Sequence, residues 1–141
     1  MKIARPALDE VRQHVAEGYP NEICGVLVSE NGSGLVTQTR RVRNRMVERA
    51  RDRYEMDPRD QIRIQRECDA RGWEIVGYYH SHPDHPARAS ATDAGRSWAG
   101  PIYVIVSCLG GRPAEANAFV ADEDGGPMRP VPLEVVDTAG G

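Results

Sequence analysis

The chain has 141 residues, of which 18 are basic and 21 are acidic, so its formal net charge is −3. This length fits one domain, and 40% hydrophobic residues with charges of both signs are typical of a soluble globular protein. The slightly negative charge argues against a nucleic-acid-binding protein, no apolar run reaches the ~20 residues of a membrane helix, and residues 1–6 lack the apolar core of a signal peptide.

Helix and strand patterns follow one another in the first third of the chain. Pro6 suits a first helical turn, and the apolar spacing after it predicts a helix over 6–18. The continuous apolar run at 23–28 predicts a strand that is buried on both faces, and a turn separates it from a second strand over 35–42. Residues 40–53 contain seven arginines, which predicts a polar strand end followed by an exposed loop.

A second helix and a central strand are expected next. A short strand is predicted over 54–56, and Asp57 followed by Pro58 is typical of a helix cap with proline in the first turn. This helix is expected to end near Ala70. The apolar run after it predicts a central strand over 73–80.

Shorter elements complete the predicted fold. A loop over 83–89 leads to a short helix that starts at Ser90, and 102–107 is another buried apolar strand. Weaker strands are predicted over 114–121 and 131–136. Because strands and helices are mixed without strict alternation, we predict an α+β or mixed α/β fold.

Cysteine content and chain organisation indicate a single cytoplasmic domain. The three cysteines are widely spaced and odd in number, which implies no disulfide framework and favours a reducing compartment: Cys24, Cys68 and Cys108. We interpret them as small buried hydrophobic residues. No linker or repeat divides the chain, so we expect one domain over 1–136 and a flexible tail over 137–141.

Three of the four histidines fall within six residues, at positions 80, 82 and 85. Side chains alternate along a strand, so His80 and His82 are expected on one face, about 6.6 Å apart along the strand. One Zn²⁺ ion with Zn–N bonds of about 2.0–2.1 Å can join them. Pro83 is expected to stop the strand there, which places the pair at an edge of the sheet where a cleft can open.

A third metal ligand must come from outside this strand. Asp93 is a good candidate, because the loop before it can fold back to the same point. Two histidines and one carboxylate leave a fourth position for water, as in catalytic zinc sites, and such a site also needs a base. Two other interpretations stay open: a solvent-facing histidine pair, and a capping box in which Ser90 and Asp93 start a helix.

A second motif competes for the same residues. The pattern His80-x-His82-x-Asp84-His85 matches the HxHxDH signature of metallo-β-lactamase-like hydrolases. That fold uses further histidines downstream, and none follows His85. We therefore keep this interpretation only as a minor alternative.

The complete pattern resembles that of the JAMM (MPN+) zinc metalloprotease family. Its motif is a glutamate near the N-terminus, then His-[Ser/Thr]-His, seven residues, serine, two residues and aspartate. This chain carries the matching residues at that spacing: Glu22, His80, Ser81, His82, Ser90 and Asp93. The segments at 20–25, 54–58 and 103–107 are similar as well, so the resemblance covers roughly residues 1–135. It is greatest to the short, single-domain bacterial branch.

This resemblance implies a fold and a set of roles. The fold is a curved β-sheet flanked by helices, of cytidine-deaminase-like architecture. One Zn²⁺ ion would be bound by His80, His82 and Asp93. Glu22 would hold the attacking water as general base, and Ser90 would donate a hydrogen bond to the oxyanion.

The resemblance also implies a substrate class. Family members cleave isopeptide or peptide bonds after the C-terminal diglycine of ubiquitin or ubiquitin-like proteins, and the short bacterial branch is associated with ubiquitin-fold sulfur carrier proteins. We therefore hypothesise a zinc peptidase that releases cysteine or a C-terminal extension from such a carrier. The alternative is a scaffold that binds metal and a ubiquitin-like partner without catalysis.

The arginine-rich segment is a candidate docking site for an acidic carrier. Its predicted substrate-binding residues are Arg45, Arg49, Arg51 and Arg53. A solvated loop with internal arginine–carboxylate pairs is the alternative. Cys24 lies two residues after Glu22, and we interpret it as a buried strand residue rather than as a thiol of the site. A partly apolar sheet edge is compatible with a homodimer.

Overall fold

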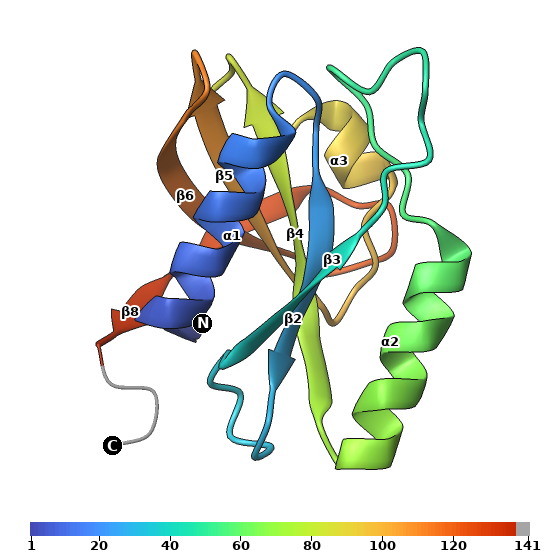
Figure 1. Cartoon of the computed structure of the whole chain (residues 1–141), viewed down its shortest axis with the longest axis vertical. Coiled ribbons are helices and arrows are strands. Elements are labelled where there is room, and N and C mark those ends of the chain that lie inside the picture. Colours follow the sequence, from blue (N-terminus) through green and yellow to red (C-terminus); the bar gives the residue numbers. More distant parts are fainter. Residues whose placement is uncertain (138–141) are drawn as a thin grey trace.

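The computed structural model describes residues 1–137 and contains a mixed sheet of six strands, with a helix packed on each face, and a second sheet of two strands (Figure 1). The elements in chain order are β1 (Lys2–Ala4), α1 (Arg5–Gly18), β2 (Cys24–Ser29), β3 (Gln38–Val42), α2 (Pro58–Arg71), β4 (Glu74–Pro83), α3 (Ala91–Gly95), β5 (Ile102–Leu109), β6 (Arg112–Ala121), β7 (Met128–Val131) and β8 (Glu134–Val136). The predicted α+β class is confirmed.

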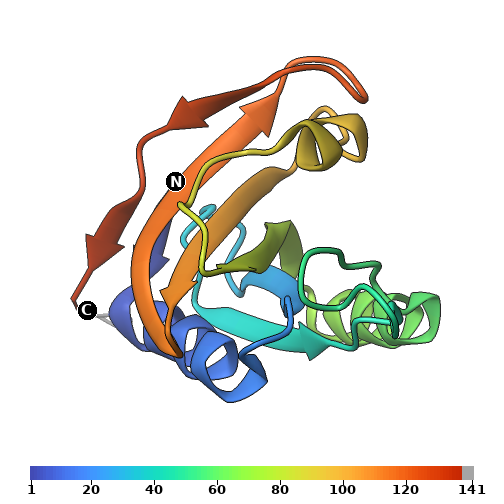
Figure 2. The same cartoon turned by 90° about the horizontal axis from the view of Figure 1, so that it is seen from above.

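The six-stranded sheet has the order β3-β2-β4-β5-β6-β7, and β1 pairs with β8 in the small sheet. All neighbours in the large sheet are antiparallel except β4 and β5, which are parallel. Seen from above, the large sheet is strongly curved, with β6 and β7 wrapping around one side (Figure 2). The expected curved sheet flanked by helices is therefore present, and β4 lies near its centre.

Helix α1 covers one face of the sheet. Its apolar positions Leu8, Val11 and Val15 recur on one side of the helix and are buried against residues such as Leu27 and Tyr79. Pro6 lies in its first turn, as predicted. Most of the hydrophobic core lies between this helix and the sheet.

Helix α2 covers part of the opposite face. Cys24, Val26 and Val28 alternate along β2 and pack against Ile64 and Cys68 of this helix. All three cysteines are free and buried, as expected. Since α1 packs on the other side of β2, this strand is buried on both faces, which explains its continuous apolar sequence.

Helix α2 is capped at both ends, and the cap at its start is the expected one. The Asp57 side chain accepts a hydrogen bond from the backbone N–H of Arg59 at 2.9 Å. Gly72 ends the helix in a left-handed conformation, with φ of 70°. The Asp57 cap fixes the direction in which the chain enters the helix from the segment before it, and that segment contributes to the candidate site.

The predicted strand over 54–56 is wrong. Among the described residues, this segment makes a single bridge, between Asn44 and Met56, and no continuous pairing. Its aromatic residue, Tyr54, packs instead on the histidine region of β4. The apolar residues here serve side-chain packing rather than a strand ladder.

Strand boundaries differ elsewhere because pairing partners are remote in the sequence. The predicted strand over 131–136 is two strands: β7 pairs with β6, and β8 pairs with β1 at the start of the chain. Pro132, which lacks a backbone N–H, lies at the break. The strand expected over 35–42 begins only at Gln38, and β1 was not predicted at all.

Near the end of the described chain, Asp137 forms an ion pair with Arg5 of α1. The rest of the expected tail, 138–141, lies outside the described residues. Within residues 1–137, no helix is both long and apolar enough to cross a membrane.

Candidate metal centre

His80 and His82 lie near the C-terminal end of β4, which is the predicted central strand and ends at Pro83 as expected. The pairing of β2 with β4 stops at Cys24 and His80. Strand β4 continues through Pro83, paired with β5 on its other side. Because β2 no longer pairs with β4 at Pro83, the missing N–H of this proline is tolerated. A cleft opens where β4 extends past β2.

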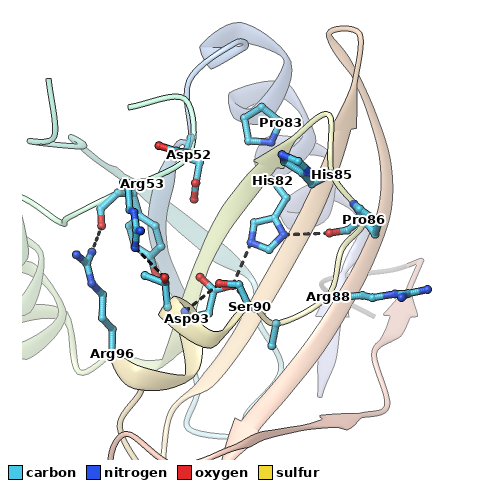
Figure 3. Close-up of a pocket in the computed structure, with 14 residues that line it drawn as sticks. Asp52, Arg53, His82, Pro83, His85, Pro86, Arg88, Ser90, Asp93 and Arg96 are labelled. Atoms are coloured by element: carbon cyan, nitrogen blue, oxygen red, sulfur yellow. Dashed lines mark hydrogen bonds and ion pairs between the residues drawn. The ribbon is translucent and has the colours of Figure 1, made fainter. Parts of the chain in front are cut away.

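The two imidazoles and the Asp93 carboxylate converge. His80 Nε2 and His82 Nε2 are 3.2 Å apart. Asp93 Oδ1 lies 3.1 Å from His80 Nε2. Asp93 Oδ2 lies 3.0 Å from His82 Nε2, and Figure 3 shows this second pair. The three side chains are only 2%, 11% and 8% exposed in the order His80, His82 and Asp93, so they form a buried set of donors.

This donor set fits a zinc ion. Two ligands of a tetrahedral zinc ion with bonds of about 2.0–2.1 Å lie about 3.3 Å apart, close to the separations of these three donors. His82 Nδ1 donates to the backbone oxygen of Pro86 at 3.0 Å, which leaves its Nε2 free to bind a metal. Two imidazoles and one carboxylate are also the ligand types that zinc prefers in open sites.

Helix α3 positions Asp93 through the capping box. Ser90 Oγ accepts a hydrogen bond from the Asp93 backbone N–H at 3.0 Å, and Asp93 Oδ2 accepts one from the Ser90 backbone N–H at 2.9 Å. This geometry is therefore compatible with Asp93 both as part of the capping box and as a metal ligand. Burial opposes ionisation of Asp93, but its hydrogen bonds with His80 and His82 hold the pKa of this carboxyl well below its usual range.

Glu22 lies beside the two histidines, in the segment before β2. Its backbone N–H donates to the Ala50 oxygen at 2.6 Å, and its backbone oxygen accepts from the Asn44 side chain at 3.0 Å. Its carboxylate belongs to a group whose donor atoms lie within 4.8 Å of one another, together with His80 and His82. Burial raises the pKa of Glu22 to about 7, with smaller electrostatic contributions from its neighbours.

Glu22 and two of the three predicted ligands, His82 and Asp93, line one pocket. Its volume is about 520 Å³, and Glu22, His82, Ser90 and Asp93 all contribute to its wall. Within the described chain, no hydrogen bond joins Glu22 to either imidazole. The Glu22 carboxylate therefore lies near the two histidines and Asp93 but forms no hydrogen bond with the imidazoles.

The predicted substrate-binding arginines differ in position. Arg53 lines this pocket and donates to the Thr92 hydroxyl at 2.7 Å. Arg49 and Arg51 line an adjoining pocket of about 440 Å³. Arg49 pairs with Asp52 at 2.7 Å and Arg45 with Glu55 at 3.9 Å. The loop thus contains internal ion pairs, and a role of these arginines in substrate binding stays a prediction.

The remaining residues of the competing HxHxDH pattern are placed differently. Asp84 accepts hydrogen bonds from the Tyr19 hydroxyl at 2.7 Å and the Gly110 N–H at 2.8 Å, outside the donor set. His85 lines the pocket, but within residues 1–137 its ring forms no hydrogen bond with the donor set. The structure therefore gives no support to a metallo-β-lactamase-like centre.

Cys24 is fully buried, and its thiol donates to the Val42 backbone oxygen at 3.5 Å. Burial raises the pKa of this thiol to about 12, so it stays protonated at neutral pH. The interpretation of Cys24 as a buried strand residue is confirmed.

Two residues of the site were missed by sequence reasoning. The Tyr54 ring stacks on His80, and the Arg96 guanidinium donates to the Tyr54 backbone oxygen. For Tyr54, the sequence signal was the similarity of the segment at 54–58 to the family pattern. We predicted a strand over 54–56 instead and therefore did not assign Tyr54 to the site.

Comparisons with known proteins identify the family of the chain. Residues 4–122 match the family described as prokaryotic homologs of the JAB domain. The chain is similar to a desampylase of Haloferax volcanii, with 38% identity over 112 residues that cover 76% of this chain and 80% of that protein.

Solved structures show the same fold. A protein from Salinibacter ruber has 35% identity and a TM-score of 0.73, with coverage of 99% of this chain and 94% of that one. A protein from Desulfitobacterium hafniense has a TM-score of 0.80 at 24% identity, with coverage of 98% and 94%. A JAB1/MPN domain protein from Archaeoglobus fulgidus has a TM-score of 0.63 at 18% identity, with coverage of 96% of this chain and 97% of that one. The chain therefore belongs to the prokaryotic JAB-domain branch of the JAMM family.

Proposed function

We propose that this protein is a zinc-dependent isopeptidase or peptidase that hydrolyses the bond after the C-terminal Gly-Gly of a ubiquitin-like protein. The observation that carries the proposal is the convergence of His80, His82 and Asp93, with Glu22 beside them in the pocket that His82 and Asp93 line. The similarity to a desampylase supports an isopeptidase that acts on a ubiquitin-like modifier. We further propose that residues 1–136 act as one catalytic domain.

Each residue of the pocket has a distinct task in this proposal. Zinc held by His80, His82 and Asp93 would polarise the scissile carbonyl and lower the pKa of a water molecule. Glu22 takes the proton from the attacking water and passes it to the leaving amine. Ser90 Oγ already accepts the Asp93 N–H, so its hydroxyl hydrogen is free to donate to the oxyanion.

For the substrate, we propose a ubiquitin-fold sulfur carrier protein that ends in cysteine or a short extension after Gly-Gly. The resemblance to the short bacterial branch supports this choice. Arginines that line the main and adjoining pockets also support an acidic partner, because opposite charge increases the rate of association: Arg49, Arg51, Arg53, Arg88 and Arg96.

The experiment compares two substrates built on one ubiquitin-like carrier. In the first, the carrier's diglycine is joined by an isopeptide bond to a lysine of a peptide; in the second, it is followed by cysteine or a short extension. Mass spectrometry measures the released products with zinc-loaded protein, with chelator-treated protein and with Glu22→Gln. Cleavage of either substrate only by the zinc-loaded natural chain supports the proposal.

Two results would count against it. If the zinc-loaded natural chain leaves both substrates intact, the protein is not a hydrolase of this class. If Glu22→Gln keeps its zinc and cleaves as fast as the natural chain, Glu22 is not the general base. A chain that binds zinc and the carrier without cleavage would instead be the non-catalytic scaffold.

A further inference from the structure

Tyr54 makes close contact with one ligand of the candidate metal centre. Its ring stacks on the His80 imidazole, with centroids 4.5 Å apart and an angle of 26° between the planes. Tyr54 also lines the pocket that Glu22 and Asp93 share. The tyrosine thus lies against the flat side of His80, whereas the metal-facing Nε2 points to Asp93.

The two histidines are held in different ways. His82 Nδ1 donates to the Pro86 backbone oxygen, and such a hydrogen bond fixes the rotation of a ligand ring. Within residues 1–137, the polar contacts of the His80 ring are made by Nε2, and no hydrogen bond joins its Nδ1 to a partner. The flat face of the His80 ring is stacked on Tyr54 instead.

Helix α3 in turn holds the tyrosine in place. The Arg96 guanidinium, directly after this helix, donates to the Tyr54 backbone oxygen. The neighbouring Arg53 donates from the loop to the Thr92 hydroxyl of α3 at 2.7 Å. Two arginine contacts in opposite directions therefore join the loop carrying Tyr54 to the helix carrying Asp93.

We propose that Tyr54 is a positioning residue for the metal centre, held over His80 by Arg96. The stack keeps the His80 ring turned so that its Nε2 faces the metal position. The arginine contacts fix the distance between the tyrosine and α3, so the His80 and Asp93 donors stay in register. The proposal rests on the zinc site of the proposed function and assigns Tyr54 no contact with substrate.

Metal affinity tests this role without any activity assay. Zinc dissociation constants are measured by competition with a chromophoric chelator for the natural chain, Tyr54→Leu, Tyr54→Phe and Arg96→Ala. Loss of a residue that orients a ligand typically weakens metal binding by roughly 10-fold or more. We expect that loss in Tyr54→Leu, a smaller loss in Arg96→Ala, and a dissociation constant within about twofold of the natural value in Tyr54→Phe, which keeps the ring.

Two further measurements separate positioning from general stability. The visible absorption of the Co²⁺-substituted protein reports ligand geometry, and its bands should shift in Tyr54→Leu but not in Tyr54→Phe. Urea unfolding of the metal-free variants reports stability alone. Arg66→Ala is the matched control for Arg96→Ala, because Arg66 is exposed on α2 and makes no side-chain contact among the hydrogen bonds and ion pairs of the described residues.

The outcomes distinguish this proposal from the proposed function. If the natural chain binds no zinc, the metal site itself is wrong. If the natural chain binds zinc and Tyr54→Leu binds it equally tightly with an unchanged cobalt spectrum, the positioning role is overturned, even if the metal-free variant unfolds at lower urea concentration.

Discussion

Asp93 combines a structural and a chemical task in one side chain. Its carboxylate completes the capping box of α3 with Ser90 and at the same time contacts His80 and His82. The cap orients the carboxylate, so the residue reaches the histidines with little freedom of its own. At the scale of single residues, the start of this short helix is part of the candidate metal centre.

Separate substitutions at this position test the two tasks. We expect His82→Ala and Asp93→Ala each to lose zinc, because each removes one of three donors. Ser90→Ala is the matched control: it removes the Ser90 Oγ half of the capping box, which costs about 1 kcal/mol of stability. It keeps the Ser90 backbone N–H that holds the Asp93 carboxylate, and all three proposed donors. Metal content is measured by elemental analysis of the purified proteins. Full zinc retention in both His82→Ala and Asp93→Ala would refute the ligand set.

His14 is a buried imidazole outside this site. Its Nδ1 lies 2.8 Å from the Tyr79 hydroxyl, between α1 and the sheet. Burial, and then the nearby Arg41, lower the pKa of His14 to about 4, below its ordinary value of 6.5. The unfolded chain therefore binds a proton at higher pH than the folded chain does.

This difference predicts a pH dependence of stability. The contribution of His14 is fully present above about pH 6.5 and is lost as the pH falls from about 6.5 toward 4. Allowing for partial solvent screening, we expect a loss of about 1–2 kcal/mol over this range. Urea unfolding at several pH values should show this loss in the natural chain and a smaller one in His14→Gln. Equal slopes for the two proteins would exclude His14 as the cause.

At the scale of elements, the site depends on how closely β4 and β5 approach. Gly77 pairs with Ile102 where the parallel pairing begins. A Cβ atom at Gly77 would lie 1.8 Å from the Ile102 backbone oxygen, too close for any side chain. The glycine thus permits the register that carries His80 and His82 to the end of the strand.

Gly77→Ala should therefore destabilise the sheet. Because the clash is with backbone, the strands must separate, and we expect the free energy of unfolding to fall by about 2–3 kcal/mol. Gly95→Ala, at the end of α3, is the control: a Cβ atom there meets nothing within 4 Å, and a change within about 1 kcal/mol is expected. Chemical denaturation measures both. Equal stability of the two variants would show that β4 and β5 have room for a side chain at Gly77.

Elements whose signals are local could be predicted from the sequence. The apolar run of β2 and the cap of α2 each lie within a few residues, and both were confirmed. The error over 131–136 arose because β8 pairs with β1, at the opposite end of the chain. Such pairing depends on the assembled fold and leaves no pattern in the segment itself.

At the scale of the whole molecule, the site shows the same difference between contacts set by local spacing and contacts set by pairing of distant segments. The spacing of His80, His82 and Asp93 was sufficient to predict their convergence, because one strand and one loop bring them together. The proximity of Glu22 depends on the antiparallel pairing of Cys24 with His80. This contact between distant segments was reached only through the family resemblance, and the stack of Tyr54 on His80 was not reached at all.

Zinc bound at this centre should stabilise the fold, because its proposed donors come from β4 and α3, and only the folded chain brings these two segments together. A ligand at 100 times its dissociation constant adds about 2.7 kcal/mol of stability, which raises Tm by roughly 10 °C in a domain of this size. Differential scanning calorimetry with and without zinc measures the shift. Asp93→Asn should lose most of it, whereas Glu22→Gln should keep it if Glu22 acts on water, as proposed, and not as a ligand. The same Tm increase in Asp93→Asn as in the natural chain would place the metal elsewhere, and loss of the increase in Glu22→Gln would make Glu22 a ligand rather than a base.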